Sequence, residues 1–238
     1  MPAIVEADDL GLYVVKFRGA GQGILALVAE LVAGEIGRAL GLQVPELVFA
    51  EVDAALGRNE PDAEIRHLLK ASVGLNLALD YLPGSTMFDP AAGDVTSVEI
   101  ASIAVWFDAF VQNVDRTARN PNLLMWHRRL HFIDHGAAFY FHHNWESAKA
   151  ESSFSASRQH VLLPWASAIR EAAAEAHRRI TPEVLGGILE MVPDEWLESQ
   201  ARNAAERRGD YRAYLTKRLA MAASFEEEAM LAHEQRLV

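Results

Sequence analysis

The 238-residue chain contains no cysteine. Without thiols it forms no disulfide, has no thiolate nucleophile and builds no Cys-ligated zinc site. It also has no apolar run of the roughly 18 residues that a membrane-spanning helix needs, and no basic start followed by an apolar signal core. We therefore expect a soluble cytoplasmic protein with no membrane partner.

Positive charge is scarce, and the formal net charge is −11. Sequence-independent binding of nucleic acid rests on clustered cations, so no nucleic-acid partner is expected. A local cationic site for a small anion is still compatible with an acidic chain. Nearly all cations are arginines, and the lysines are only Lys16, Lys70, Lys149 and Lys217.

The order of the expected elements predicts an α+β fold. Half of the residues are hydrophobic and 23% are charged, as in an ordinary globular protein with a real core. Expected strands cover 1–11 in part, 12–17, 44–52, 72–81 and a hairpin at 123–133. Expected helices cover 24–40, 62–71 and 95–114, and the chain from 160 onward is helical with breaks at Pro164, Pro182, Pro193 and Gly209. Strands early and helices late favour two lobes that share a cleft.

A Pro-Gly turn at 83–84 marks the expected boundary between the lobes. The first lobe, 1–82, is then a small β-rich unit with one long helix. The second, 83–238, is mainly helical. The segment 85–94 is expected to be a loop.

The stretch from Phe107 to Phe141 carries the main evidence for function. Asp115 is followed five positions later by Asn120, and two apolar runs joined by a charged turn then lead to Asp134. Such runs predict a β-hairpin. Folding the hairpin returns Asp134 to the neighbourhood of Asn120, so that three oxygen-bearing side chains converge.

These three side chains have the chemistry of a phosphoryl-transfer site. A carboxylate and an amide oxygen suit Mg²⁺, which prefers few protein ligands together with phosphate and water. A second carboxylate, Asp115, can accept a proton or orient a hydroxyl. For each residue alone, a helix cap or a turn is the favoured explanation. Their order, with apolar strands between Asn120 and Asp134, favours the functional interpretation.

Lys16 and Glu30 are the candidate partners in the first half. Lys16 occupies an interior position of the strand 12–17, where it either points to solvent or serves a site. Glu30 lies in the following helix and is preferred to Glu35 because its neighbours are apolar. The loop 18–23 between strand and helix is glycine-rich, and it is either a phosphate cradle or, as we favour, a flexible turn.

Other polar residues near Asp115 leave alternatives open. Arg116 and Arg119 either compensate charge on a transferring phosphate or pair with acids at the surface. Asn122 is a spare candidate for metal binding or backbone support. Five histidines between 127 and 143 raise the idea of zinc, but a hairpin turn scatters their side chains, so zinc is disfavoured.

Four segments together resemble the HipA-type kinases, above all the small HipA-like kinase-domain proteins. They are YVVKFRG (13–19), the Glu30-bearing helix ending in ALGLQVP (39–45), NVDRTARNPNLL (113–124) and IDHG (133–136). The likeness covers nearly the whole chain. It implies a protein-kinase-like fold with ATP and Mg²⁺ as cofactors and Ser/Thr hydroxyls of proteins as acceptors, although relatives in the wider superfamily phosphorylate lipids and small molecules.

The resemblance assigns a role to each candidate residue. Lys16 would hold the α- and β-phosphates, and Glu30 would orient Lys16. Asp115 would position the acceptor hydroxyl. The metal would be bound by Asn120 and Asp134. Adenine would face the backbone of a short segment, namely Asp80, Tyr81 and Leu82.

Two departures from the kinase pattern weaken the transfer of roles, and the first of them favours a second hypothesis. No glycine precedes Gly11, so the glycine-rich hairpin that covers the phosphates ahead of the lysine strand is missing or replaced. His135 stands where protein kinases place Phe. The alternative is therefore a nucleotide-binding pseudokinase that serves as an interaction module.

Overall fold

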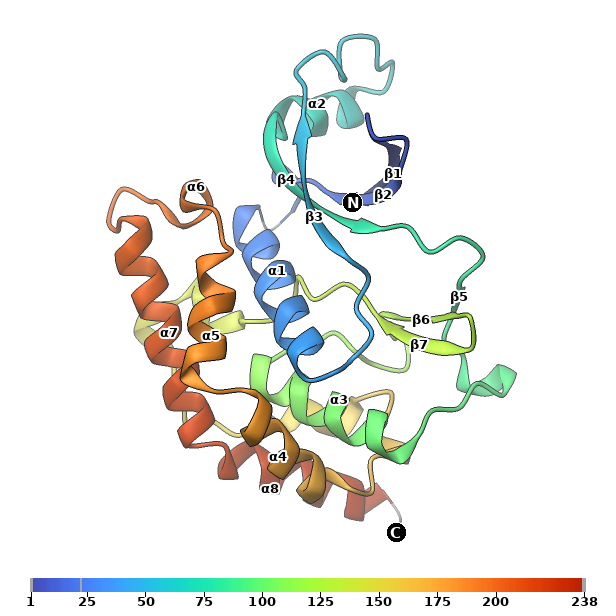
Figure 1. Ribbon diagram of the computed structural model, residues 1–238, viewed down its shortest axis with the longest axis vertical. Coiled ribbons are helices and arrows are strands. Elements are labelled where there is room, and N and C mark those ends of the chain that lie inside the picture. Colours follow the sequence, from blue (N-terminus) through green and yellow to red (C-terminus); the bar gives the residue numbers. More distant parts are fainter. Residues whose placement is uncertain (1, 22, 237–238) are drawn as a thin grey trace.

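The computed structural model, which describes residues 2–21 and 23–236, has a small sheet at one end and a helical body at the other (Figure 1). The four-stranded antiparallel sheet has the order β1-β2-β4-β3. Its strands are β1 (Pro2–Glu6), β2 (Leu12–Lys16), β3 (Leu47–Val52) and β4 (Gly74–Asp80). The predicted pairing of the first two strands is confirmed, and β3, which follows Pro45, is an edge strand.

A second, three-stranded sheet contains the predicted hairpin. It consists of β5 (Thr86–Met87), β6 (Leu123–Trp126) and β7 (Arg129–Phe132). His127 and Arg128 form the turn with φ values of 47° and 62°, the left-handed conformation that two-residue hairpin turns require. The expected loop 85–94 is partly wrong, because Thr86 and Met87 pair with β6.

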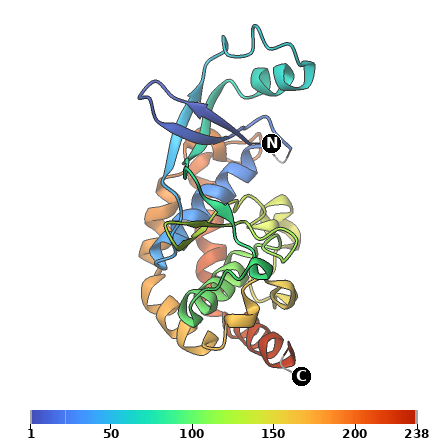
Figure 2. The same ribbon diagram turned by 90° about the vertical axis from the view of Figure 1, so that its right-hand side faces the viewer.

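Eight α-helices are found among the described residues, and Figure 2 shows from the side how most of them gather away from the four-stranded sheet. They are α1 (Ile24–Ala39), α2 (Ala63–Ala71), α3 (Val98–Val111), α4 (Ile169–Arg179), α5 (Pro182–Glu190), α6 (Asp194–Leu197), α7 (Ala204–Ala220) and α8 (Ala223–Arg236). Short 3-10 turns occupy 90–92, 140–143, 145–147, 155–159 and 163–165. None of these helices is both long and apolar enough to cross a bilayer.

The predicted helix break at Gly209 is wrong, because α7 runs through it. The helix starts at a capping box, in which Asn203 and Glu206 satisfy each other's backbone N–H groups. Tyr211 and Leu215 then lie fully buried one turn apart. Burial of this face outweighs the roughly 1 kcal/mol that a glycine costs inside a helix.

The buried apolar residues form two cores of very different size. The large core joins α1 to the helices α3–α8 and the β6–β7 hairpin. The small core lies on the other face of the sheet and contains Val15, Phe17, Val52 and Ala78, partly covered by α2. The predicted fold class is confirmed, whereas the exact boundary at residue 82 stays a prediction.

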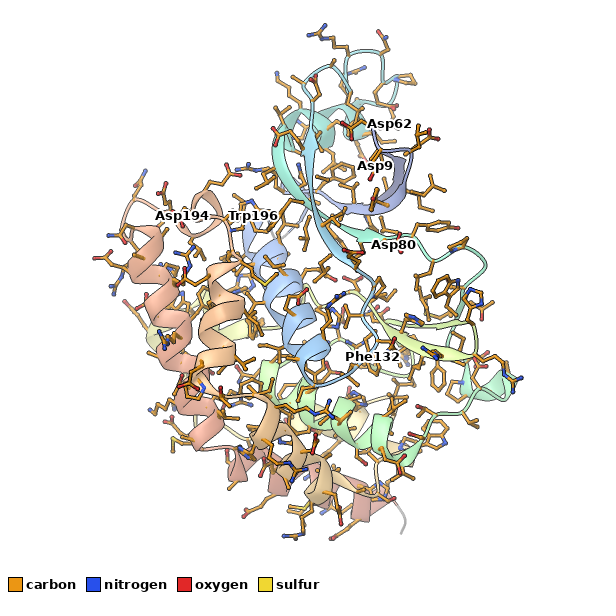
Figure 3. The ribbon with its side chains drawn as sticks, in the orientation of Figure 1. Asp9, Asp62, Asp80, Phe132, Asp194 and Trp196 are labelled. Carbon is orange, nitrogen blue, oxygen red and sulfur yellow. The ribbon has the colours of Figure 1, made fainter. Side chains whose placement is uncertain are left out.

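The short helix α6 of the helical body contacts the four-stranded sheet at its edge strand β3. The ring of Trp196 in α6 packs edge-on against Phe49 of β3, with centroids 5.6 Å apart. Glu195 Oε2 lies 3.8 Å from Nη1 of Arg18, two residues after β2. Figure 3 labels Trp196 at the top of α1 and Asp80 on the far side of that helix. The sheet is therefore held by α6 as well as by its packing on α1, through Leu77 of β4, and by the chain that follows β4.

Candidate active site

One cleft of about 240 Å³ collects four of the predicted site residues: Lys16, Glu30, Asp115 and Asp134. They come from β2, from α1, from the loop after α3 and from the segment after β7. Ala20 and Gly21 of the glycine-rich loop also line the cleft. Residues more than a hundred positions apart in the sequence therefore meet at a single hollow.

Lys16 points into this cleft and not to solvent. Strand alternation places Val15 on the small core, so Lys16 faces the opposite side of the sheet. Its Nζ lies 2.5 Å from Asp134 Oδ1 and 3.4 Å from Glu30 Oε2. Burial alone would lower the pKa of Lys16, but the two carboxylates outweigh burial, and the pKa is raised.

Glu30 is a buried charge beside one cation, Lys16. Its side chain is 1% exposed, whereas Glu35 pairs with Arg38 away from the cleft lining. Burial would raise the pKa of Glu30, but the Lys16 ammonium and contacts from His135 lower the pKa to about 2. Glu30 is thus ionised, and the predicted choice of Glu30 over Glu35 agrees with the geometry.

Asp115 and Asn120 form a local pair in the loop after α3. Asn120 Nδ2 donates to Asp115 Oδ2 at 3.1 Å, and the Asp115 amide donates to Asn113 Oδ1 at 3.2 Å. Both residues are exposed. Asn120 itself does not line the cleft. Its amide hydrogens face Asp115, which leaves its side-chain oxygen available to another ligand.

Asp134 provides the second carboxylate. It lies two residues after β7 with a φ of 57°, in the left-handed region, and its side chain is 49% exposed. Among the described residues no three His or acidic side chains converge as an all-protein metal cage. One carboxylate and one amide oxygen nevertheless fit Mg²⁺, which takes most of its remaining ligands from phosphate and water.

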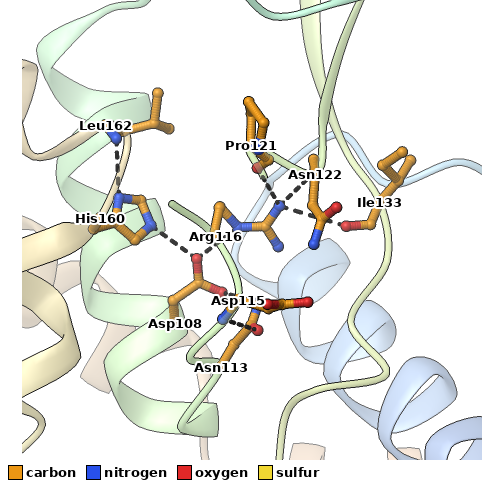
Figure 4. A network of polar contacts seen from close by, with 9 residues as sticks. All are labelled: Asp108, Asn113, Asp115, Arg116, Pro121, Asn122, Ile133, His160 and Leu162. Atoms are coloured by element: carbon orange, nitrogen blue, oxygen red, sulfur yellow. Dashed lines mark hydrogen bonds and ion pairs between the residues drawn. The ribbon is translucent and has the colours of Figure 1, made fainter. Parts of the chain in front are cut away.

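Arg116 lies in a buried network and does not point into the cleft (Figure 4). It is 1% exposed, which rules out the surface alternative that the sequence left open. Its Nε donates to Asp108 Oδ2 at 2.6 Å, and its terminal nitrogen donates to the Asn122 carbonyl at 2.5 Å. Bonded to α3 and to the start of β6, it fixes the loop that carries Asp115.

His160 completes this network from a distant segment. The Leu162 amide donates to Nδ1 at 3.1 Å, so Nε2 carries the hydrogen and donates to Asp108 Oδ2 at 2.8 Å. Burial would raise the pKa of Asp108, but Arg116 and His160 lower it to about 2. We did not predict Asp108 or His160. An acidic residue inside the most apolar helix was the signal that could have found Asp108.

Asn122 supports the backbone. Its carbonyl accepts hydrogen bonds from Arg116 and, at 3.1 Å, from the Ile133 amide, so it ties β6 to the residue before Asp134. The histidines of this region are scattered. His142 contacts the Tyr211 hydroxyl at 2.9 Å, and His131 contacts the Arg129 carbonyl at 3.1 Å.

The segment predicted to face adenine ends β4 and does not line the cleft. Asp80 pairs with Tyr13, and Leu77 pairs with Lys16, so Asp80 lies three residues, or roughly 10 Å, along the sheet from the lysine. The Tyr81 amide donates to the Leu12 carbonyl, Asp80 is exposed and Leu82 is buried. Contact between the segment 80–82 and a nucleotide stays a prediction.

Comparison with solved structures shows the kinase-like fold. The chain is similar to the Helicobacter pylori proinflammatory kinase CtkA, with a TM-score of 0.57, 13% identity, and coverage of 100% of this chain and 95% of that one. A chain in the complex of the Shewanella oneidensis toxin–antitoxin system HipA, HipB and its operator DNA is also similar. It has a TM-score of 0.45, 13% identity, and coverage of 92% of this chain and 60% of that one.

Comparison of the sequence itself gives the family. No curated protein matches the chain. The family model described as HipA-like kinase matches residues 1–225, which is nearly the entire sequence. The predicted resemblance is confirmed: the chain belongs to the HipA-like kinase family.

Proposed function

We propose that this protein transfers the γ-phosphoryl group of ATP to a hydroxyl group, and that the acceptor is a Ser or Thr side chain of a protein. The observation that carries the proposal is the meeting of Lys16, Glu30, Asp115 and Asp134 at one cleft. A cation paired with a buried carboxylate and two further carboxylates are the parts that phosphoryl transfer needs.

Lys16 and Glu30 would hold the phosphates. The Lys16 ammonium is charged, because its pKa is raised, and it sits at the cleft wall. Glu30 is fixed in position because α1 is part of the large core. Its carboxylate would keep the Lys16 ammonium directed into the cleft. A fixed positive charge there stabilises the negative oxygens of a triphosphate.

Asp115 would orient the attacking hydroxyl. It lines the cleft and is exposed, and Asn120 holds one of its carboxylate oxygens. The other oxygen is free to accept a hydrogen bond from an acceptor hydroxyl and take its proton as the oxygen attacks phosphorus. Mg²⁺ bound by Asp134 and Asn120 would neutralise charge on the phosphates.

The test is transfer of labelled γ-phosphate to the protein itself and to a mixture of Ser/Thr-containing peptides. Asp115→Ala should lower transfer by roughly a hundredfold or more while nucleotide still binds. Asp134→Ala should lose both transfer and its dependence on Mg²⁺. The matched control is Asp8→Ala, an exposed carboxylate outside the cleft. Equal transfer by Asp115→Ala and Asp8→Ala would refute the assignment.

A pseudokinase that binds nucleotide without turnover is the second candidate. The observation behind it is that the β1–β2 turn lies at the end of the hairpin opposite Lys16, because Glu6 pairs with Leu12 and Pro2 with Lys16. This turn therefore does not cover the cleft. If ATP raises the melting temperature only when Mg²⁺ is present, and no phosphate is transferred, the pseudokinase is favoured.

We also propose that the protein has no nucleic-acid or membrane partner and that it is cytoplasmic. The net charge of −11 supports the first point, since a polyanion would be repelled. Retention on immobilised DNA at physiological salt would contradict it.

A further inference from the structure

His135 lies where three parts of the fold meet. It follows Asp134, and its ring is fully buried. The ring of Phe107 in α3 packs edge-on against it, with centroids 5.7 Å apart. Glu30 of α1 lies on another side, with Oε1 3.6 Å from His135 Nδ1. One side chain thus contacts the cleft segment, the long helix and the centre of the large core.

The His135–Glu30 contact is short of hydrogen bonds. Both ring nitrogens of His135 and both carboxylate oxygens of Glu30 are buried without a hydrogen bond, and only Oε2 has an ion pair, with Lys16 at 3.4 Å. Buried polar groups without partners are costly, and a charged acceptor gains most from a donor. A shift of about half an ångström would bring Nδ1 and Oε1 within hydrogen-bond distance.

The Lys16 ammonium lies between two carboxylates and is not held by Glu30 alone. Lys16 is the strong cation beside it, yet the ammonium sits closer to Asp134, at 2.5 Å, than to Glu30, at 3.4 Å. A bound triphosphate would draw the ammonium further toward its own oxygens. An ionised, fully buried carboxylate would then need another donor to remain in place.

We propose that His135 is that donor: its Nδ1–H bonds Glu30 Oε1 and keeps Glu30 oriented toward Lys16 while nucleotide occupies the cleft. His135 is thus a positioning residue that acts through Glu30, and the inference rests on the proposed function. A phenylalanine at 135 would fill the same space and remove the ring donor beside Oε1, while the backbone N–H of residue 135 would remain.

The first experiment needs no nucleotide. Nitrogen-15 NMR of the histidine ring at neutral to mildly basic pH, with His135→Asn used to assign the signal, reports which nitrogen carries the hydrogen. The inference requires the hydrogen on Nδ1. A His135 ring with the hydrogen on Nε2 alone has no donor facing Glu30 and overturns it.

The second experiment measures the dissociation constant of the Mg²⁺ complex of a non-hydrolysable ATP analogue by calorimetry. His135→Phe should weaken binding tenfold to a hundredfold, as expected for loss of a hydrogen bond to a charged group. His135→Asn, which keeps a donor near the place of Nδ1, should bind more tightly than His135→Phe. The control is His67→Phe, an exposed histidine of α2.

A double-mutant cycle with Glu30→Gln separates positioning from mere packing. In the Glu30→Gln background, His135→Phe should change binding by less than about threefold. Independent effects of the two substitutions, or wild-type affinity of His135→Phe, would overturn the inference. If the wild-type chain binds no nucleotide, the proposed function fails, and the ring-nitrogen spectrum still decides whether His135 can donate to Glu30.

Discussion

Lys16 and Glu30 touch each other but belong to different packing units. Glu30 is on α1, whose buried residues are continuous with the large core of the helical body. Lys16 is on β2, whose opposite face belongs to the small core under α2. The long helix lies between two strands in the sequence, yet it is part of the helical body by packing.

The two packing units differ in how firmly they hold the site residues. The loops that carry Asp115 and Asp134 are fixed by the buried network around Arg116, and Glu30 is fixed by its helix. The lysine is carried by a thin sheet. Local stability follows the amount of buried apolar contact, so we expect the sheet to yield first.

Removing Arg116 should have the largest effect. Arg116→Ala leaves the buried carboxylate of Asp108 without its cation and should cost about 3–5 kcal/mol of unfolding free energy. Arg119→Ala, an exposed neighbour, should stay within about 0.5 kcal/mol. Urea unfolding followed by circular dichroism measures both. Similar losses for the two variants would mean that the network does not hold the helical body together.

Matched leucine truncations compare the two units directly. Leu31→Ala in α1 opens a cavity in the large core and should cost about 2–5 kcal/mol. Leu69→Ala in α2, which is only partly buried against the small core, should cost about 1 kcal/mol. Hydrogen exchange should also show α2 amides opening more easily than those of α1. Greater protection of α2 would reverse the comparison.

Acid should weaken the helical body through Asp108. Its pKa is about 2 in the fold against an ordinary 3.8, so its contribution is fully present above about pH 5 and is lost as pH falls toward 2. The loss amounts to about 2 kcal/mol. Asp108→Asn should be less stable at neutral pH and show a flatter decline between pH 5 and 2. An unchanged slope would contradict this assignment.

The sequence predicted those parts of the site that depend on local patterns. The strand pattern left the direction of Lys16 open between solvent and a site, whereas helix position and apolar neighbours favoured Glu30 over Glu35. The hairpin after Asn120 follows from two apolar runs and a polar turn, and it returns Asp134 to the cleft that Asp115 also lines. Each of these relations depends on a few neighbouring residues.

The remainder depends on contacts between distant segments. His160 meets Asp108 from a stretch of short 3-10 turns, which has no periodicity that a sequence can reveal. Arg116 has the same charge and nearly the same neighbours as Arg119, and only the fold shows that one is buried and the other exposed. Gly209 suggested a break, but burial of Tyr211 and Leu215 decided otherwise.

The attachment of the sheet on two sides has a consequence for motion. Trp196 and Glu195 of α6 contact the sheet on one side of α1, and the chain leaving β4 after Asp80 joins it on the other (Figure 1). Leu77, the partner of Lys16 in β4, also belongs to the large core, so a further contact ties the sheet to the helical body beside the lysine. We therefore expect β1 and α2, whose apolar contacts are with the small core, to move more than Lys16 does.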